Sequence, residues 1–374
     1  MEQKKNLKEV AKLFLKLGVI GFGGPAVHIA MIEEEVVRKR KWMDHQHFLD
    51  LVGATNLIPG PNSTEMTMHI GKERAGWKGL VVAGACFITP AVIITALFAW
   101  AYQQYGHLPQ VAPFIYGIKP AIIAVVVVGM INLGRKALKS VQLAVIGVLA
   151  AIAVLTGMNE IVVLFGAGVL GIVLFFLQQR ANSARLIAPL VLLQVQQFNL
   201  SLSPVQTFLT FLKIGSILYG TGYVLFAFLD AELVATGLLS KQQLIDAIAV
   251  GQFTPGPVFS SATFIGWQLG GMGGAVAASI GIFLPSFLFV ALLNPLIPKL
   301  RRSKVMAAFL DTVNVASVAI ILSIMIEMSR AALLDWRAIV IAIAGFVMAF
   351  AFPKVNTAFI VAGGALAGYL LHFV

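Results

Sequence analysis

The residues best suited to ligand binding surround two Pro-Gly-Pro motifs, at Pro59-Gly60-Pro61 and Pro255-Gly256-Pro257. Each motif removes two backbone donors and disfavours helix at the preceding residue, so one helix must end there and another begin. Proline fits the first turn of the new helix, where the amide groups have no partner within the helix and carry the positive end of its dipole. Amide and hydroxyl side chains follow both motifs: Asn62, Ser63, Thr64, Ser260 and Ser261. Each motif therefore brings hydrogen-bond donors and partial positive charge to one point.

Two glycine-rich breaks lie upstream of these motifs, at Gly21-Phe22-Gly23-Gly24-Pro25 and Gly220-Thr221-Gly222. Glycine lets a backbone come close to a ligand or to a neighbouring helix, and the two explanations carry equal weight here. Polar side chains at Asn56 and Gln252 precede the two Pro-Gly-Pro motifs and are further candidates for ligand contact.

Two lysines, Lys16 and Lys213, sit in apolar surroundings just before the glycine breaks. A lysine within a membrane span costs about 2.5–3.5 kcal/mol on insertion scales and marks a functional site by default. The alternative is that the long side chain reaches the membrane interface. Lys213 lies well inside its segment, so we expect it to supply positive charge to a ligand.

Two titratable residues are candidates for proton coupling. Glu65 follows the first Pro-Gly-Pro motif and either carries a proton or pairs with Lys72 or Arg74, and the pairing is slightly favoured. His28 is the second candidate, although a single histidine near a helix end is more often simply hydrogen-bonded. The six histidines are scattered, so we expect no metal site. No nucleotide-binding or catalytic pattern occurs, so we expect neither a cofactor nor an enzyme.

The composition places these residues in a membrane protein. Of the 374 residues, 59% are hydrophobic and 11% are charged, whereas a soluble domain has about 25% charged residues. A soluble enzyme, a disordered chain and a nucleic-acid-binding domain are therefore excluded. The net charge of +11 comes from cations between apolar runs, as in a protein that crosses the membrane several times. The lone Cys86 excludes disulfides within the chain, and the polar N-terminus shows no cleavable signal peptide.

Apolar runs long enough to cross a membrane predict eight spans. They cover residues 77–103, 112–133, 141–155 with extended ends, 161–177, 273–296, 305–328, 336–352 and 357–373. The segments 10–32 and 205–229 are also long enough, but each contains one of the glycine-rich breaks. The Pro-Gly-Pro regions have arms too short to cross alone, so each is either a re-entrant hairpin or one broken helix.

The chain consists of two related halves. Phe14-Leu15-Lys16-Leu17-Gly18 matches Phe211-Leu212-Lys213-Ile214-Gly215, and the two Pro-Gly-Pro motifs match at nearly the same offset of 195 to 197 residues. We divide the chain into a first repeat (1–178), a linker (179–203) and a second repeat (204–374). Each repeat is predicted to contain a glycine-broken first helix, the Pro-Gly-Pro unit and four further transmembrane helices.

Loop charges predict that the two repeats have inverted topology. Lys72, Arg74 and Lys78 lie at the start of the 77–103 span, whereas Lys299 and Arg301 follow the equivalent span of the second repeat. Because cytoplasmic loops are rich in Lys and Arg, the two spans run in opposite directions. Inverted repeats with paired broken helices are typical of secondary transporters with a midplane site. The side of the N-terminus depends on whether the Pro-Gly-Pro unit is re-entrant or spanning, and both remain open.

These motifs resemble the chromate transporter family in its long, two-domain form. The resemblance rests on the paired glycine breaks, on Trp42 after a basic stretch, on the segment Asn56–Ser63 and on the segment Gln252–Pro257, and it covers nearly the full length. It implies a multi-pass protein of the plasma (inner) membrane that exports chromate by alternating access and gives chromate resistance. The alternatives are uptake or exchange of sulfate or another oxyanion, and an anion channel. The implied partners are chromate, sulfate and the lipid bilayer, with no nucleic acid, and a homodimer is possible.

Chromate is a tetrahedral dianion, and the donors identified above suit it. The expected substrate-binding residues are Lys16, Gly23, Gly24, Asn56, Pro59, Gly60, Pro61, Asn62, Ser63, Thr64, Lys213, Gly220, Thr221, Gly222, Gln252, Pro255, Gly256, Pro257, Ser260 and Ser261. The second repeat has Thr221-Gly222 where the first has Gly24-Pro25, so the two halves of the site are not expected to be equivalent.

Overall fold

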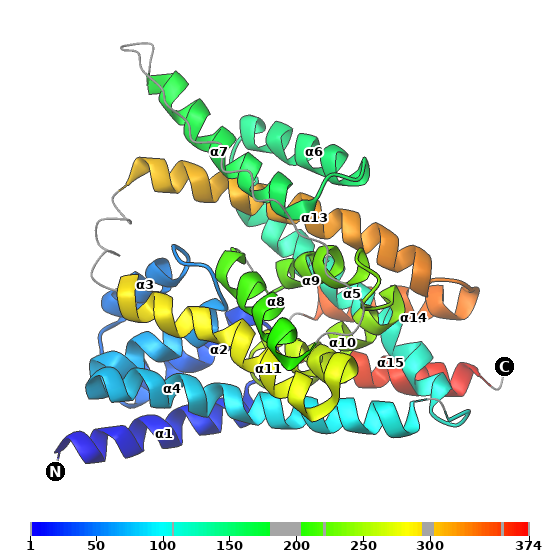
Figure 1. The fold of residues 1–374 in the computed structure, drawn as a ribbon, viewed down its shortest axis with the longest axis horizontal. Helices are drawn as coiled ribbons and strands as arrows, with labels where there is room; N and C mark the ends of the chain where they lie inside the picture. Colours follow the sequence, from blue (N-terminus) through cyan, green and yellow to red (C-terminus); the bar gives the residue numbers. More distant parts are fainter. Residues whose placement is uncertain are drawn as a thin grey trace.

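The computed structural model describes residues 2–106, 108–179, 203–219, 222–293, 303–352 and 355–372. Within these ranges the chain forms helices and no strands, which confirms the predicted all-α fold (Figure 1). Most of the predicted linker, together with Gly220 and Thr221, lies outside the described residues.

The two repeats contain matching series of helices. The first has α1 (Glu2–Ile20), α2 (Pro25–Glu33), the π-helical turn η1 (Glu34–Lys39), α3 (His45–Thr55), α4 (Asn62–Tyr105), α5 (Ala112–Ala137), α6 (Val141–Leu155) and α7 (Glu160–Gln179). The second has α8 (Pro204–Ile217), α9 (Val224–Leu229), η3 (Asp230–Val234), α10 (Lys241–Phe253), η4 (Val258–Ser260), α11 (Ser261–Leu293), α13 (Lys304–Ala332), α14 (Trp336–Ala351) and α15 (Thr357–Leu371).

Five of the described helical segments are long and apolar enough to cross a membrane: Asn62–Tyr105, Ala112–Ala137, Glu160–Gln178, Val258–Leu292 and Lys304–Ala332. The helices α6, α14 and α15 are apolar but shorter. The chain is therefore a membrane protein, as its composition predicts.

Helices α4 and α11 each fold back on themselves at a glycine. The backbone leaves helical geometry at Ala75 and Gly76 in α4 and at Gly270 and Gly271 in α11. In α11 the Thr263 and Ser279 hydroxyls lie 2.7 Å apart across the bend. Each helix thus has a short arm that follows the Pro-Gly-Pro motif and a long arm that returns past it.

The contacts show that the interrupted segments are hairpins. Lys16 on α1 lies 2.9 Å from Glu35 on η1, so the chain turns back at the glycine break. His47 at the start of α3 lies 2.8 Å from Glu73 at the end of the short arm of α4. Residues 10–32 therefore turn back at the glycine break and do not form one continuous helix, and the Pro-Gly-Pro unit has the form of a hairpin.

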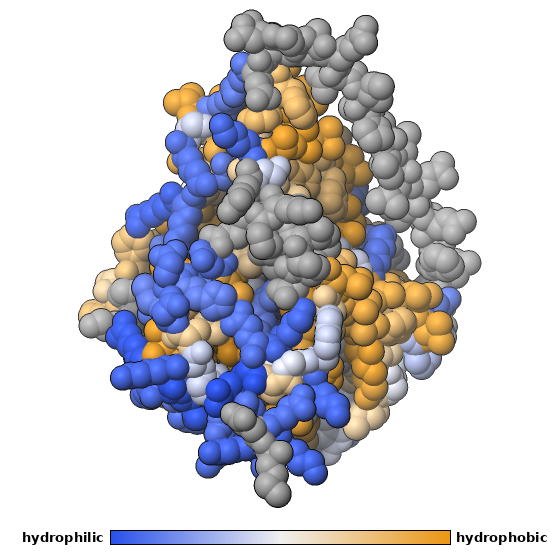
Figure 2. Space-filling model, turned by 90° about the vertical axis from the view of Figure 1, so that its left-hand side faces the viewer, coloured by the Kyte–Doolittle hydropathy of each residue, from blue (hydrophilic) through white to orange (hydrophobic). Residues whose placement is uncertain are grey.

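The hairpins of the first repeat are held together at one end of the molecule, which we call the cationic end. There Arg74 pairs with Glu9 at 2.9 Å, and the Arg40 and Arg74 guanidinium groups lie against the Trp42 ring. Figure 2 looks onto this end and shows hydrophilic residues gathered over it beside a hydrophobic flank. The N-terminus and the basic stretch before Trp42 lie at the same end because α1 and α2 form a hairpin.

The hairpins of the second repeat are held at the opposite end, which we call the acidic end after Asp230, Glu232 and Glu327. There Lys241 pairs with Asp230 at 2.7 Å and with Glu327 at 2.6 Å. Trp267 on the short arm of α11 donates to Gln103 near the end of α4, at 2.7 Å. The hairpins of the two repeats thus extend toward each other from opposite ends, and their tips meet inside the molecule.

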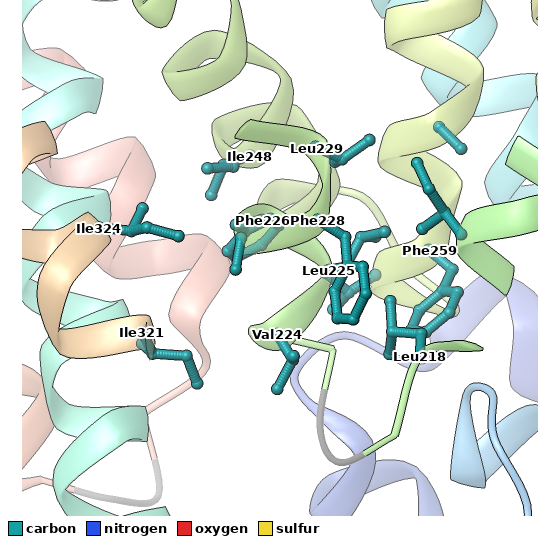
Figure 3. Packing of buried hydrophobic residues seen from close by; sticks show 14 of the residues in the cluster. Leu218, Val224, Leu225, Phe226, Phe228, Leu229, Ile248, Phe259, Ile321 and Ile324 are labelled. Atoms are coloured by element: carbon teal, nitrogen blue, oxygen red, sulfur yellow. The ribbon is translucent and has the colours of Figure 1, made fainter. Parts of the chain in front are cut away.

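The remaining helices are exchanged between the repeats. Helix α5 packs against α14 and α15 of the second repeat, and α13 packs against α6 and α7 of the first. The hairpins differ in how they meet this scaffold. All six residues of α9 are buried, and Figure 3 shows them between Ile321 and Ile324 of α13 and Phe259. By contrast, the main packing partners of α2 in the described part of the chain are α1, η1, α3 and α4, all of its own repeat. Only two residues of α2, His28 and Ile32, are buried.

Candidate functional site

A cavity of ≈ 30 Å³ lies where the hairpin tips of both repeats meet. Its walls are Pro25, His28, Pro61, Asn62, Ser63, Gly222, Pro257, Val258 and Phe259. Both Pro-Gly-Pro motifs therefore border the same small space, as their matching positions predict. The space is enough for roughly two water molecules, so a tetrahedral oxyanion would have to separate the tips slightly.

Four helices begin at this cavity. Pro25 opens α2, Asn62 opens α4 and Val258 opens η4, which continues into α11, while Gly222 lies two residues before α9. The first amide groups of each helix have no partner within the helix, and the helix dipoles add partial positive charge. The cavity is therefore surrounded by the kind of backbone donors that bind anions.

Two matched hydrogen bonds hold the tips together. The Gly60 amide donates to the Leu218 carbonyl at 2.9 Å, and the Gly256 amide donates to the Gly21 carbonyl at 2.7 Å. Gly21 and Leu218 are equivalent positions just after α1 and α8. Each Pro-Gly-Pro glycine thus satisfies a carbonyl at the helix end of the other repeat, which removes acceptors that would repel an anion.

His28 and Ser63 form the polar wall of the cavity. The His28 Nε2 atom lies 2.9 Å from the Gly21 carbonyl, and its Nδ1 atom lies 3.3 Å from the Ser63 hydroxyl. A neutral His28 that donates to Gly21 accepts a hydrogen bond from Ser63. A protonated His28 donates through both nitrogens and leaves the Ser63 hydroxyl free to donate into the cavity.

The structure brings together only part of the expected site. Pro61, Asn62, Ser63, Gly222, Pro257 and His28 line the cavity. Buried residues beside the motifs but not among the lining residues are Pro59, Gly60, Thr64, Gln252, Pro255, Gly256, Ser260 and Ser261. Gly23 and Gly24 are half-buried in the first break, and Asn56 accepts a hydrogen bond from Asn62 at 2.6 Å. Pro25, Val258 and Phe259 were not expected as site residues, since their side chains are apolar.

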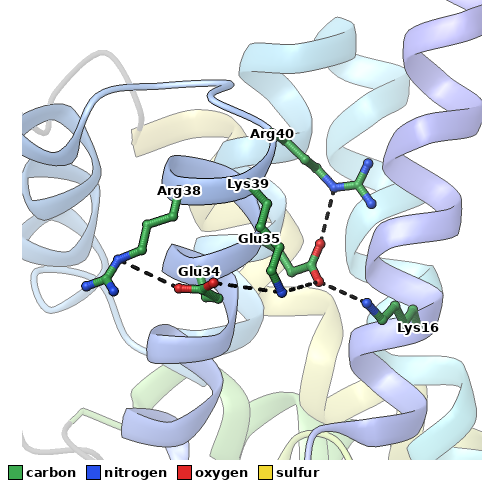
Figure 4. A network of polar contacts seen from close by, with 6 residues as sticks. All are labelled: Lys16, Glu34, Glu35, Arg38, Lys39 and Arg40. Carbon is green, nitrogen blue, oxygen red and sulfur yellow. Dashed lines mark hydrogen bonds and ion pairs between the residues drawn. The ribbon is translucent and has the colours of Figure 1, made fainter.

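The two lysines do not reach the cavity, contrary to the expectation from their apolar surroundings. Lys16 pairs with Glu35 at 2.9 Å and Lys213 pairs with Glu232 at 2.6 Å, each within its own hairpin. Figure 4 shows Lys16 in a network with Glu35, Lys39 and Arg40 near the cationic end. The two ion pairs occupy equivalent positions in the two repeats, and neither lysine is among the residues that line the cavity.

Replacing Lys213 by glutamine should therefore change little. The Lys213 and Glu232 side chains are 41% and 11% exposed. Because the lysine end of the pair is accessible, we expect the pair to contribute about 1 kcal/mol, the upper end of the range for exposed ion pairs. We expect Lys213→Gln to keep its thermal stability within about 1 kcal/mol of the parent and to retain most of its transport activity in vesicles. Loss of transport at normal membrane expression would show instead that Lys213 contributes charge to the ligand.

Glu65 lies behind the cavity wall on the first turn of α4. Its side chain is 0% exposed, and the Ser286 hydroxyl is a hydrogen-bonding neighbour of its carboxylate. The favoured pairing with Lys72 or Arg74 is wrong, because Arg74 pairs with Glu9 and the Lys72 ammonium lies over the Trp77 ring at 4.2 Å. The carboxylate lies instead beside the Ser286 hydroxyl, next to Gly60.

A larger cavity of ≈ 420 Å³ lies between α5, α6 and α13. Its walls are apolar except for Arg135 at one end, so it lacks the converging donors that an oxyanion needs. The described residues contain no cluster of side chains that could hold a metal ion.

Comparisons with known proteins find the same family in both repeats. The family model named Chromate transporter matches residues 8–172 and 205–369. A probable chromate transport protein of Synechococcus elongatus is 27% identical over 375 residues, covering 98% of this chain and 95% of that protein. A chromate transport protein of Cupriavidus metallidurans is 28% identical over 379 residues, covering 98% and 93%. One from Pseudomonas aeruginosa is 28% identical over 379 residues, covering 96% and 91%.

No solved structure matches the chain significantly. The family model nevertheless covers both repeats, and the three relatives extend over nearly the whole length of the chain. This coverage confirms the resemblance that the glycine breaks and the Pro-Gly-Pro motifs predict. The chain belongs to the chromate transporter family.

Proposed function

We propose that the protein is a secondary transporter that exports chromate across the plasma membrane and binds it in the cavity between the four hairpin tips. The observation that carries this proposal is that α2, α4 and η4 begin at one small cavity and that α9 begins two residues beyond it. Backbone amides and the Ser63 hydroxyl can donate to the oxygens of a tetrahedral dianion without a fixed cation. The chromate transport proteins to which the chain is similar support chromate as the substrate, and sulfate, which has the same shape and charge, is its natural competitor.

The protein is proposed to work by alternating access between inverted repeats. The hairpins extend from opposite ends, and the two pairs pack differently, with α9 buried against α13 and α2 mostly free of the scaffold. Exchange of these two packing arrangements would open the cavity to one side and then to the other. A cytoplasmic location of the cationic end is supported by its cations, because cytoplasmic loops are rich in Lys and Arg.

The proposed orientation can be tested with single cysteines. Gly106 follows α4 and Ser303 precedes α13. The end of α4 and the start of α13 lie at opposite ends of the molecule (Figure 1). We expect Gly106→Cys and Ser303→Cys, each in a Cys86→Ser background, to react with a membrane-impermeant maleimide from opposite sides. Labelling of both from the same side would contradict the inverted arrangement.

We also propose that Glu65 carries the coupling proton. A buried carboxylate that pairs with no cation among the described residues is unfavourable in its charged form and takes up a proton instead. An ionised Glu65 would repel a dianion in the neighbouring cavity, so proton binding and anion binding favour each other. A proton that travels with the dianion leaves a net negative charge, whose export the membrane potential favours. His28 is the alternative carrier, through its contact with Ser63.

Counterflow in proteoliposomes tests the proposed transport. Vesicles loaded with chromate should take up labelled sulfate or chromate in a saturable exchange, and Ser63→Ala should raise the half-saturating concentration. A conductance that neither saturates nor exchanges would identify an anion channel instead. Exchange of sulfate that chromate does not inhibit would identify a sulfate transporter.

A further inference from the structure

A buried ionic cluster outside the cavity joins three elements near the acidic end. Lys119 on α5 lies 3.4 Å from Oδ1 of Asp246 on α10. The Tyr102 hydroxyl on the long arm of α4 donates to Oδ2 of the same aspartate at 2.6 Å. The side chains of Lys119 and Asp246 are only 16% and 5% exposed. Helix α10 of the second repeat is thus held to α5 by an ion pair and to α4 by a hydrogen bond.

The lysine and the tyrosine of this cluster are not repeated at the equivalent positions of the second repeat. Asp50 on α3 is the equivalent of Asp246, since both precede their Pro-Gly-Pro motifs by the same distance. The positions that match Lys119 and Tyr102 at the offset of that region are Asn314 and Ile297. The Lys119–Asp246 ion pair is therefore not duplicated at the equivalent positions, and it belongs to the hairpin that closes the acidic end.

The pair constrains how that end can open. Alternating access requires α10 to move relative to α5, and Asp246 is the one acid paired with Lys119 in the described part of the chain. Movement of α10 alone would leave a buried ammonium without a counter-charge, which is strongly unfavourable. An anion that leaves the cavity toward the acidic end can remove this obstacle by taking the place of the Asp246 carboxylate.

We propose that Lys119 is a second, transient oxyanion site on the path from the cavity to the acidic end, and that Asp246 occupies this site when the transporter is empty. The proposal rests on the proposed function. The side chain of Asp246 acts as a stand-in for the substrate, so the hairpin at the acidic end separates from α5 only when an anion arrives to replace it. This arrangement prevents the acidic end from opening while the transporter holds no anion. Such an opening would dissipate the proton gradient without exporting substrate.

Counterflow measurements with chromate on the acidic side of proteoliposomes test the proposal. Lys119→Gln should raise the half-saturating chromate concentration by about tenfold or more, because a charged hydrogen-bonding partner is lost. Asp246→Asn should lower it, because the competing carboxylate is gone. The double variant Lys119→Gln with Asp246→Asn should remain as weak as Lys119→Gln alone. Lys139→Gln is the matched control, because Lys139 pairs with Asp311 at an exposed position, at 2.7 Å.

A purely structural brace gives the opposite pattern. In that case both single variants would be impaired alike, and the double variant or the exchanged pair Lys119→Asp with Asp246→Lys would restore activity. Either result overturns the proposal. Should Lys119→Gln fail to reach the membrane, the Asp246→Asn variant alone decides, since only a competitor site predicts tighter binding. Absence of counterflow in the parent protein would refute the proposed function itself and is thus a separate outcome.

Discussion

Gly60→Ala is expected to abolish transport and to destabilise the protein by roughly 3 kcal/mol or more. Gly60 has φ +136°, a conformation that is essentially restricted to glycine. A methyl group there would overlap both the Glu65 carboxylate and the Ser286 hydroxyl. The strain would also displace the Gly60 amide, which donates to the Leu218 carbonyl of the other repeat. Thermal unfolding in detergent and chromate counterflow measure the two effects.

Gly237→Ala provides the matched control for this substitution. Gly237 also has a positive φ, of +77°, but nothing lies within 4 Å of the place where its methyl group would be. The expected cost is about 1–2 kcal/mol, with transport retained. Equal effects of the two substitutions would show that the contact between the hairpin tips contributes nothing beyond backbone strain.

Glu65→Gln is expected to separate anion movement from proton movement. Glutamine resembles the protonated carboxyl group in shape but cannot release a proton. Chromate counterflow, which needs no net proton transfer, should therefore continue in this variant. Proton movement coupled to chromate should fall to the background level, and the rate should lose its dependence on pH. A pH-sensitive dye inside the vesicles, read beside chromate flux, measures both.

The matched control lies at the other end of the same helical arm. Glu73 is exposed and contacts His47 at 2.8 Å, so Glu73→Gln should leave both fluxes unchanged. Proton movement that survives in Glu65→Gln would exclude Glu65 as the carrier and leave His28 as the remaining candidate. Loss of counterflow as well would show that the carboxylate is needed for the anion site itself.

Apolar runs predict the plain helices accurately but not the hairpins. The run Val141–Leu155 becomes α6 with these bounds but without the extension predicted at its ends. At each glycine break the chain could equally continue across the membrane or turn back. Their direction is decided by contacts such as that between Lys16 and Glu35, and these form only once the tip has folded.

Some features of the candidate site could likewise be predicted from the sequence, and others could not. The matching positions of the Pro-Gly-Pro motifs predict that they meet, because a duplicated chain places equivalent segments in equivalent surroundings. The role of the lysines could not be predicted from their apolar neighbours alone. A usable signal was nevertheless present, since Glu35 and Glu232 recur at the same offset as Lys16 and Lys213. Val258 and Phe259 carry no chemical signal and reach the cavity only through the start of η4.

The exchange of helices between the repeats has a consequence for biosynthesis. Helix α5 finds its packing partners α14 and α15 only when the ribosome has nearly completed the chain. Until α10 emerges, Lys119 also lacks Asp246, and the carbonyl after α1 lacks the Gly256 amide. The first half is therefore inserted into the membrane before these polar groups have their partners. We expect it to depend on the insertion machinery during this time. Two halves synthesised as separate polypeptides would each remain incomplete until they met.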